Sequence, residues 1–290
     1  MSMVKAPGKR QRMAAKASGT LNYRSPNSSN KRRHLTFLDL PGEIRTAIYE
    51  LSFPTVRVEV TRAKAKSCED WEEPLDNRRR LTYKLLSPRG KDHKVDKSAV
   101  IPESLPFGLV LASRQIYKET AFYLYFNTQF VFYSTKALKR FILQSNCACQ
   151  ANITSLEIHR LINGEPRLTF FRYFKLKGDD SWERICRIIS WSFPGLKELY
   201  FNLKIHDWPI ELNLDEDWAR PILFFGEKGV DHAEVNLRMG MFDENKVRAV
   251  AEKLERRLMT EEANRRKDEK EFLKIMEAVS AVEVEGDNNP

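Results

Sequence analysis

The chain has 290 residues, 42% hydrophobic and 11% aromatic, which supplies a real core and excludes a wholly disordered protein. The formal net charge is +9, and residues 1–34 alone carry nine Lys or Arg and no Asp or Glu, which leaves 40 basic against 40 acidic residues in the remainder. This balance argues against a nucleic-acid-binding face on the folded part, which would need its own basic surplus.

Residues 1–34 are expected to form a disordered basic tail, because Gly, Ser, Pro and Asn occur throughout them. Two clusters in this tail could serve nuclear localisation or contact polyanions: Lys9, Arg10 and Arg12, and Lys31, Arg32 and Arg33. A solvated tail without a partner is an equally good interpretation. The tail lacks the apolar segment of a secretory signal, and no later run is long and apolar enough to span a membrane. We therefore predict a nuclear or cytoplasmic protein with no membrane partner.

A short amphipathic helix is predicted to begin at Pro41, which suits the first position of a helix because its missing N–H is not needed there. Glu43 places a carboxylate in the first turn, where the helix dipole favours it. One face of this helix is apolar, with side chains at helical spacing: Leu40, Ile44, Ala47, Ile48 and Leu51. Such a face must be docked on something, either within this chain or on a partner.

The next elements complete a first region at residues 35–133. Residues 56–60 alternate as a strand does, and a charged insertion at 61–104 follows, with one strand-like piece at 81–86. A second strong helix is predicted over 107–126, and an aromatic strand over 129–133.

From 134 to 242 we expect helices alternating with apolar strands centred on Leu156, Leu199 and Val235. This alternation is typical of a parallel sheet, and the spacing suggests short, degenerate leucine-rich-like units. Residues 243–290 are expected to form one long helix, to about residue 280, and an acidic tail. The predicted class is α+β, with the N-terminal helices packed on a mixed sheet.

The chain shows no phosphate loop, dinucleotide fingerprint, nucleophile elbow or zinc-protease motif, so we predict a protein that is not an enzyme and has no cofactor. The four cysteines are sparse, which fits a reducing compartment. Cys147 and Cys149 are the best candidates for a metal site, with His159 next along the chain. Two cysteines cannot complete a four-ligand zinc site, so we predict no metal and two reduced thiols.

Two sequence blocks resemble the F-box-like proteins common in filamentous fungi, especially a subgroup with a Leu-Pro-x-Glu-Ile-Arg helix. The first block is Leu38-x-Leu40-Pro41-x-Glu43-Ile44-Arg45-x-x-Ile48-Tyr49. The second is Leu111-Ala-Ser-Arg114-Gln115-Ile116-Tyr117-x-Glu119-Thr120-Ala121, followed by an aromatic strand. Together they mark residues 35–133 as an F-box-like domain.

The resemblance implies a non-catalytic interaction module that docks on a Skp1-type adaptor of a cullin-type ubiquitin ligase, while the following region selects an unknown protein substrate. The residues that would contact the adaptor are Leu40, Pro41, Ile44 and Ile48. Alternatively, Ile44 and Ile48 close the protein's own core, and the strand at 56–60 makes this the favoured geometry. A different function is also open: a nuclear interaction protein whose basic tail contacts nucleic acid.

Overall fold

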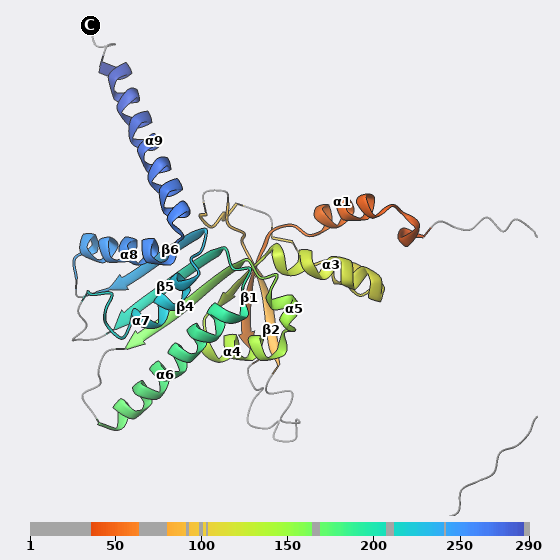
Figure 1. Ribbon diagram of the computed structural model, residues 1–290, viewed down its shortest axis with the longest axis horizontal. Helices are drawn as coiled ribbons and strands as arrows, with labels where there is room; N and C mark the ends of the chain where they lie inside the picture. Colours follow the sequence, from red (N-terminus) through yellow and green to blue (C-terminus); the bar gives the residue numbers. More distant parts are fainter. Residues whose placement is uncertain are drawn as a thin grey trace, which may run out of the picture.

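The computed structural model describes residues 36–63, 80–90, 93–98, 101–102, 104–163, 169–206, 212–240 and 242–286 (Figure 1). The predicted basic tail, much of the charged insertion and the last residues of the predicted acidic tail lie outside this part of the chain. The described residues form helices and a mostly parallel sheet, so the predicted α+β class is confirmed.

The sheet is six-stranded in the described residues, with the order β2-β1-β3-β4-β5-β6. β2 pairs with β1 in the antiparallel sense, and the other neighbouring pairs are parallel. The strands are β1 (Val56–Arg62), β2 (Leu81–Leu86), β3 (Thr128–Phe132), β4 (Ser155–Asn163), β5 (Glu198–His206) and β6 (His232–Met239). Because β3 pairs with β4, one continuous sheet joins the two regions that the sequence analysis separated at residue 133.

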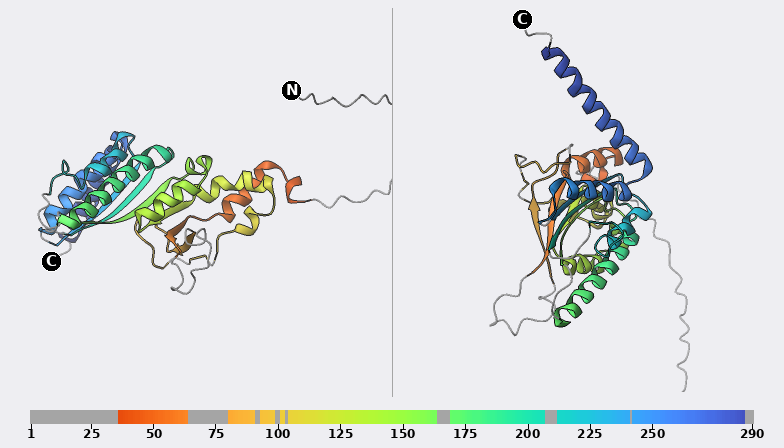
Figure 2. Two further views of the ribbon diagram at one scale, coloured as in Figure 1. Left: turned by 90° about the horizontal axis from the view of Figure 1, so that it is seen from below. Right: turned by 90° about the vertical axis from the view of Figure 1, so that its left-hand side faces the viewer.

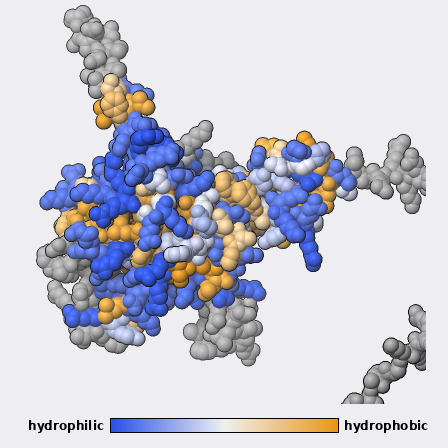
Figure 3. Space-filling model, viewed as in Figure 1, coloured by the Kyte–Doolittle hydropathy of each residue, from blue (hydrophilic) through white to orange (hydrophobic). Residues whose placement is uncertain are grey.

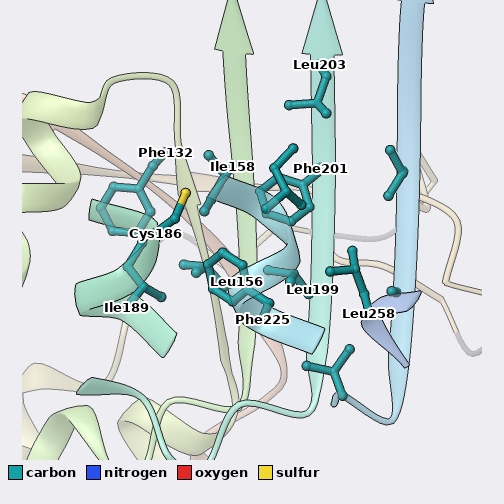
Figure 4. Packing of buried hydrophobic residues seen from close by; sticks show 14 of the residues in the cluster. Phe132, Leu156, Ile158, Cys186, Ile189, Leu199, Phe201, Leu203, Phe225 and Leu258 are labelled. Carbon is teal, nitrogen blue, oxygen red and sulfur yellow. The ribbon is translucent and has the colours of Figure 1, made fainter. Parts of the chain in front are cut away.

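One face of the sheet carries the hydrophobic core. Every second residue of the parallel strands points to this face, as a period of two requires, and Leu156, Leu199 and Phe201 are almost completely buried there. The covering helices are α4 (Thr135–Gln144), α6 (Thr169–Ser192), α7 (Arg220–Leu223) and α8 (Glu244–Leu258), with the short 3-10 helix η3 (Phe224–Glu227). Figure 4 shows side chains of α6, η3 and α8 meeting those of β3, β4 and β5.

Three helices form an arm beside the sheet: α1 (Gly42–Ser52), α2 (Phe107–Val110) and α3 (Arg114–Phe126). A 3-10 turn, η1 (Phe37–Asp39), precedes α1. Figures 1 and 2 show α1 and α3 at one end of the molecule, away from α6 and α8. The arm has its own buried cluster, separate from the core under the sheet, made of Tyr49, Phe53, Val110 and Ile116.

The long helix predicted over 107–126 is divided into α2 and α3. Ser113 has an extended backbone, and its hydroxyl accepts a hydrogen bond from the backbone N–H of Ile116 at 3.1 Å. Ser113 is therefore the N-cap of a new helix, because a serine oxygen satisfies an amide that has no partner within the first turn. Apolar spacing alone did not reveal this boundary.

The prediction of a single C-terminal helix from residue 243 is also wrong, since α8 ends at Leu258 and α9 (Glu261–Gly286) begins after Thr260. Met259 forms a parallel bridge with Val230, which holds its backbone extended. The hydroxyl of Thr260 then caps α9 by accepting from the N–H of Ala263 at 3.2 Å. The right-hand view of Figure 2 shows α9 projecting away from the sheet.

Candidate functional site

Helix α1 is held on α3 by a polar clamp centred on Glu119. The Arg45 guanidinium donates to both Glu119 carboxylate oxygens at 3.0 and 3.1 Å, and the Tyr49 hydroxyl donates to Oε2 at 2.8 Å. Gln115 adds a hydrogen bond from the same helix as Glu119, at 3.1 Å. Arg45, Tyr49 and the buried Phe53 are four residues apart, so one stripe of α1 faces α3.

The clamp keeps Glu119 ionised. Hydrogen bonds from Arg45, Tyr49 and Gln115, in decreasing order of effect, lower the pKa of this carboxyl to about 2. The planar guanidinium matches the two carboxylate oxygens, and such charge-assisted bonds are among the stronger ones in proteins. The clamp therefore fixes which side of α1 faces inward at neutral pH.

The predicted apolar face of α1 consequently points outward. Ile44 is 49% exposed and Leu51 is 87% exposed. Ala47 and Pro41 are also exposed, while Ile48 and Leu40 are half-buried. The expectation that this face closes the protein's own core is wrong for Ile44, because Arg45, Tyr49 and Phe53 occupy the inner side. We call Ile44, Ala47, Ile48 and Leu51 the outer stripe.

Further apolar side chains lie exposed on α2 and α3. Phe122 and Phe126, one turn apart, stack with ring centroids 4.9 Å apart although both are exposed. Other large exposed side chains in these helices and the link between them are Phe107, Leu111 and Tyr117. Figure 3 shows hydrophobic residues on the arm surface that faces the viewer. Apolar side chains concentrated in this way are typical of interaction surfaces.

A second cluster, which the sequence analysis missed, lies on the sheet face opposite the core. Glu157 of β4 is 1% exposed and accepts hydrogen bonds from Arg57 of β1 at 2.8 and 3.0 Å. Arg89, which lies shortly after the end of β2, donates to the same oxygen at 3.0 Å. His159 and Asn202 contact the other oxygen at 2.8 and 3.1 Å.

These contacts determine the charge of Glu157. Burial acts to raise its pKa, but the hydrogen bond with His159 and the charges of Arg57 and Arg89 outweigh it and lower the pKa to about 2. We interpret this buried carboxylate with its two arginines as a structural ion cluster. The sequence signal for this cluster was the presence of polar residues that alternate with apolar ones in the strands, such as Arg57 between Val56 and Val58.

The other candidates from the sequence are not brought together. Cys147 is exposed and Cys149 is buried in the short helix α5 (Cys147–Gln150), whereas His159 is engaged with Glu157 on the polar face. The described residues contain no group of three or more His, Cys, Asp or Glu placed to hold a metal ion. The six basic residues of the predicted tail contacts lie outside the described residues. Among the described helices, none is long and apolar enough to cross a membrane.

The fold thus defines an α+β protein with a helical arm and a sheet that is apolar on one face and polar on the other. The chain belongs to the family described as a domain of unknown function, DUF7730, whose model matches residues 30–222. The match includes the arm and strands β1 to β5, and it ends within α7. No curated protein and no solved structure shows a significant match to the chain.

Proposed function

We propose that this protein is a non-catalytic interaction module and that the outer stripe of α1 docks on a partner protein. The observation that carries this proposal is the orientation of α1. Its polar and aromatic side faces α3, and Ile44 and Leu51 face solvent at 49% and 87% exposure. Apolar residues at positions i, i+3, i+4 and i+7 form the kind of surface that helix recognition uses.

The partner we propose is a Skp1-type adaptor of a cullin-type ubiquitin ligase, with the sheet body recruiting a protein substrate. The proposal rests on the resemblance of residues 38–49 and 111–121 to F-box-like proteins. Leu40, Pro41, Ile44 and Ile48, the residues carried over from that resemblance, are all exposed or half-buried and so are within reach of a partner. The arm also stands apart from the helices that cover the sheet (Figure 1).

The proposal is tested by measuring binding of the purified chain to a Skp1-type adaptor. We expect the double variant Ile44→Glu, Leu51→Glu to lose at least about tenfold in affinity, because carboxylates would be buried at the contact. Ile44 is 49% exposed and Leu51 is 87% exposed. Substitutions at exposed positions usually change the free energy of unfolding by only about 0.5 kcal/mol. The folded protein should therefore keep its melting temperature.

A matched control is Leu143→Glu, since Leu143 is 69% exposed on α4, outside the arm. This variant should bind the adaptor as the wild type does. Absence of adaptor binding by the wild type would overturn the adaptor assignment. Undiminished binding by the double variant would show that the outer stripe is not the contact.

A further inference from the structure

Helix α6 buries one side and exposes the other. Trp182, Ile185 and Ile189 are each at most 3% exposed and pack in the core. Tyr173 and Trp191 each lie nine residues from Trp182, about two and a half helical turns, so they are on the opposite side of the helix. Both are well exposed, at 63% and 71%. The outer side of α6 therefore runs for about 27 Å between two exposed aromatic side chains.

Large aliphatic side chains lie between these two aromatic ones. Leu176 follows Tyr173 by three residues and Ile188 precedes Trp191 by three, and both are exposed. We call Tyr173, Leu176, Ile188 and Trp191 the α6 surface. Tyrosine and tryptophan favour the boundary between water and an apolar phase, because the ring is apolar and its polar group stays hydrated. The α6 surface thus has an interfacial side chain near each end and apolar ones between them.

The charge around the α6 surface is positive after every carboxylate of α6 is counted. α6 carries five Lys or Arg against three Asp or Glu, a surplus of two. Each of the three carboxylates forms an ion pair with a Lys or Arg of the same helix. A lysine also lies near each aromatic ring, since Lys177 Nζ is 6.0 Å from the Tyr173 ring centroid and Lys228 Nζ is 5.9 Å from that of Trp191.

The elements packed against α6 do not cancel this surplus. α4 carries three Lys or Arg and no Asp or Glu. α7 and η3 contribute one arginine and one glutamate, which balance. Charges in residues 35–290 are equal in number, so this positive region is local. Figure 1 shows the first residues of α6 extending past the end of β4.

From this arrangement we propose that the α6 surface binds to a membrane surface that contains anionic lipids. The helix lies in the plane of the membrane, its aromatic and aliphatic side chains enter the headgroup region, and the cations of α6 and α4 meet the anionic headgroups. A lipid surface uses both kinds of side chain, whereas the phosphates of a nucleic acid would attract only the cations.

The sequence prediction of no membrane partner rested on the lack of a spanning segment, and a helix that lies on the membrane surface needs none. The α6 surface shares no residue with the outer stripe of the arm. Membrane binding is therefore independent of the proposed adaptor docking.

The test is co-sedimentation of the full chain with vesicles of phosphatidylcholine alone and with vesicles that also contain phosphatidylserine. We expect stronger binding to the anionic vesicles, by about fivefold for each cation that reaches the surface, and weaker binding as salt is raised. The double variant Leu176→Glu, Trp191→Glu should lose at least about tenfold in vesicle affinity, because its carboxylates are repelled by the headgroups and are costly to desolvate. Both positions are exposed, so the melting temperature should be kept.

The matched control is Ile44→Glu, Leu51→Glu, which makes the same change in net charge on the arm. It should bind the vesicles as the wild type does. Residues 1–34 also carry nine cations, so sedimentation alone does not locate the contact. Tryptophan fluorescence locates it: vesicles should shift the emission of the wild type to shorter wavelength, and Trp191→Phe should lose this shift while it still sediments with them.

Four results would overturn the proposal. They are no binding of the wild type to anionic vesicles, full affinity in the α6 double variant, equal losses in the two double variants, and vesicle binding without a shift that depends on Trp191. Binding of single-stranded RNA but not of vesicles, lost in the α6 double variant, would also overturn it and would assign the α6 surface to nucleic acid.

Discussion

The arm and the sheet body each place one glutamate among arginine and other donors, yet the two settings differ in burial. The Glu157 side chain is 2% exposed and that of Glu119 is 28% exposed. The sheet carries a large hydrophobic core on the face opposite the Glu157 cluster, whereas the buried cluster of the arm has only four side chains. Similar polar contacts therefore lie beside a large core in the sheet body and beside a small buried cluster in the arm.

This difference in burial fits different roles for the arm and the sheet body. A region with few buried apolar contacts opens at lower free energy than a core, and interaction surfaces are often drawn from such regions. The arm combines a small buried cluster with the outer stripe and other exposed apolar side chains, while the sheet combines a much larger core with the buried Glu157 cluster. Substitutions at Glu157 and in the Glu119 clamp therefore affect the two regions separately.

The largest effect is expected for Glu157→Gln. The variant leaves Arg57 and Arg89 buried without their shared countercharge, and breaking a buried ion pair in this way costs about 3–5 kcal/mol of unfolding free energy. Urea denaturation followed by far-UV circular dichroism measures the loss. The matched variant Glu119→Gln should lose clearly less, because the Glu119 side chain is 28% exposed, against 2% for Glu157. Equal losses in the two variants would contradict the ranking by burial.

A smaller effect is expected from acid. The pKa of Glu157 is about 2 in the folded protein against an ordinary value of 4.5, so its contribution is fully present above pH 4.5 and is lost as the pH falls toward 2. The shift corresponds to about 3 kcal/mol at neutral pH. The stability difference between wild type and Glu157→Gln, measured by urea denaturation across this range, should shrink as the pH falls. A constant difference would show that Glu157 does not titrate in this window.

Much of the fold was predictable because strands and apolar spacing are local signals. The strand at 81–86 coincides with β2, and the alternation after residue 134 gave a parallel sheet. The divisions at Ser113 and Met259 were missed because they depend on a cap and on a bridge to Val230, which spacing does not reveal.

The candidate sites show the same division between local and distant information. The apolar face of α1 was predicted correctly, but the favoured expectation that it closes the core was wrong for Ile44, because Arg45 and Tyr49 meet Glu119, about 70 residues away in the chain. The polar face needs contacts such as Arg57 with Glu157, which are 100 residues apart. No local pattern specifies such pairs, since their meeting depends on the order of strands in the sheet.

The smallest effect is expected for Tyr49→Phe, which removes only the hydroxyl that donates to Glu119 and keeps the ring in the arm's cluster. The loss of one such hydrogen bond costs about 1 kcal/mol. Because the arm's cluster is separate from the sheet core, this loss should loosen α1 without affecting β4 and β5. Native-state hydrogen exchange should therefore show faster exchange at α1 amides and unchanged rates in the central strands. If the amides of both regions accelerated together, the arm and the sheet would be one cooperative unit, and the smaller cluster would not make the arm a separately opening surface.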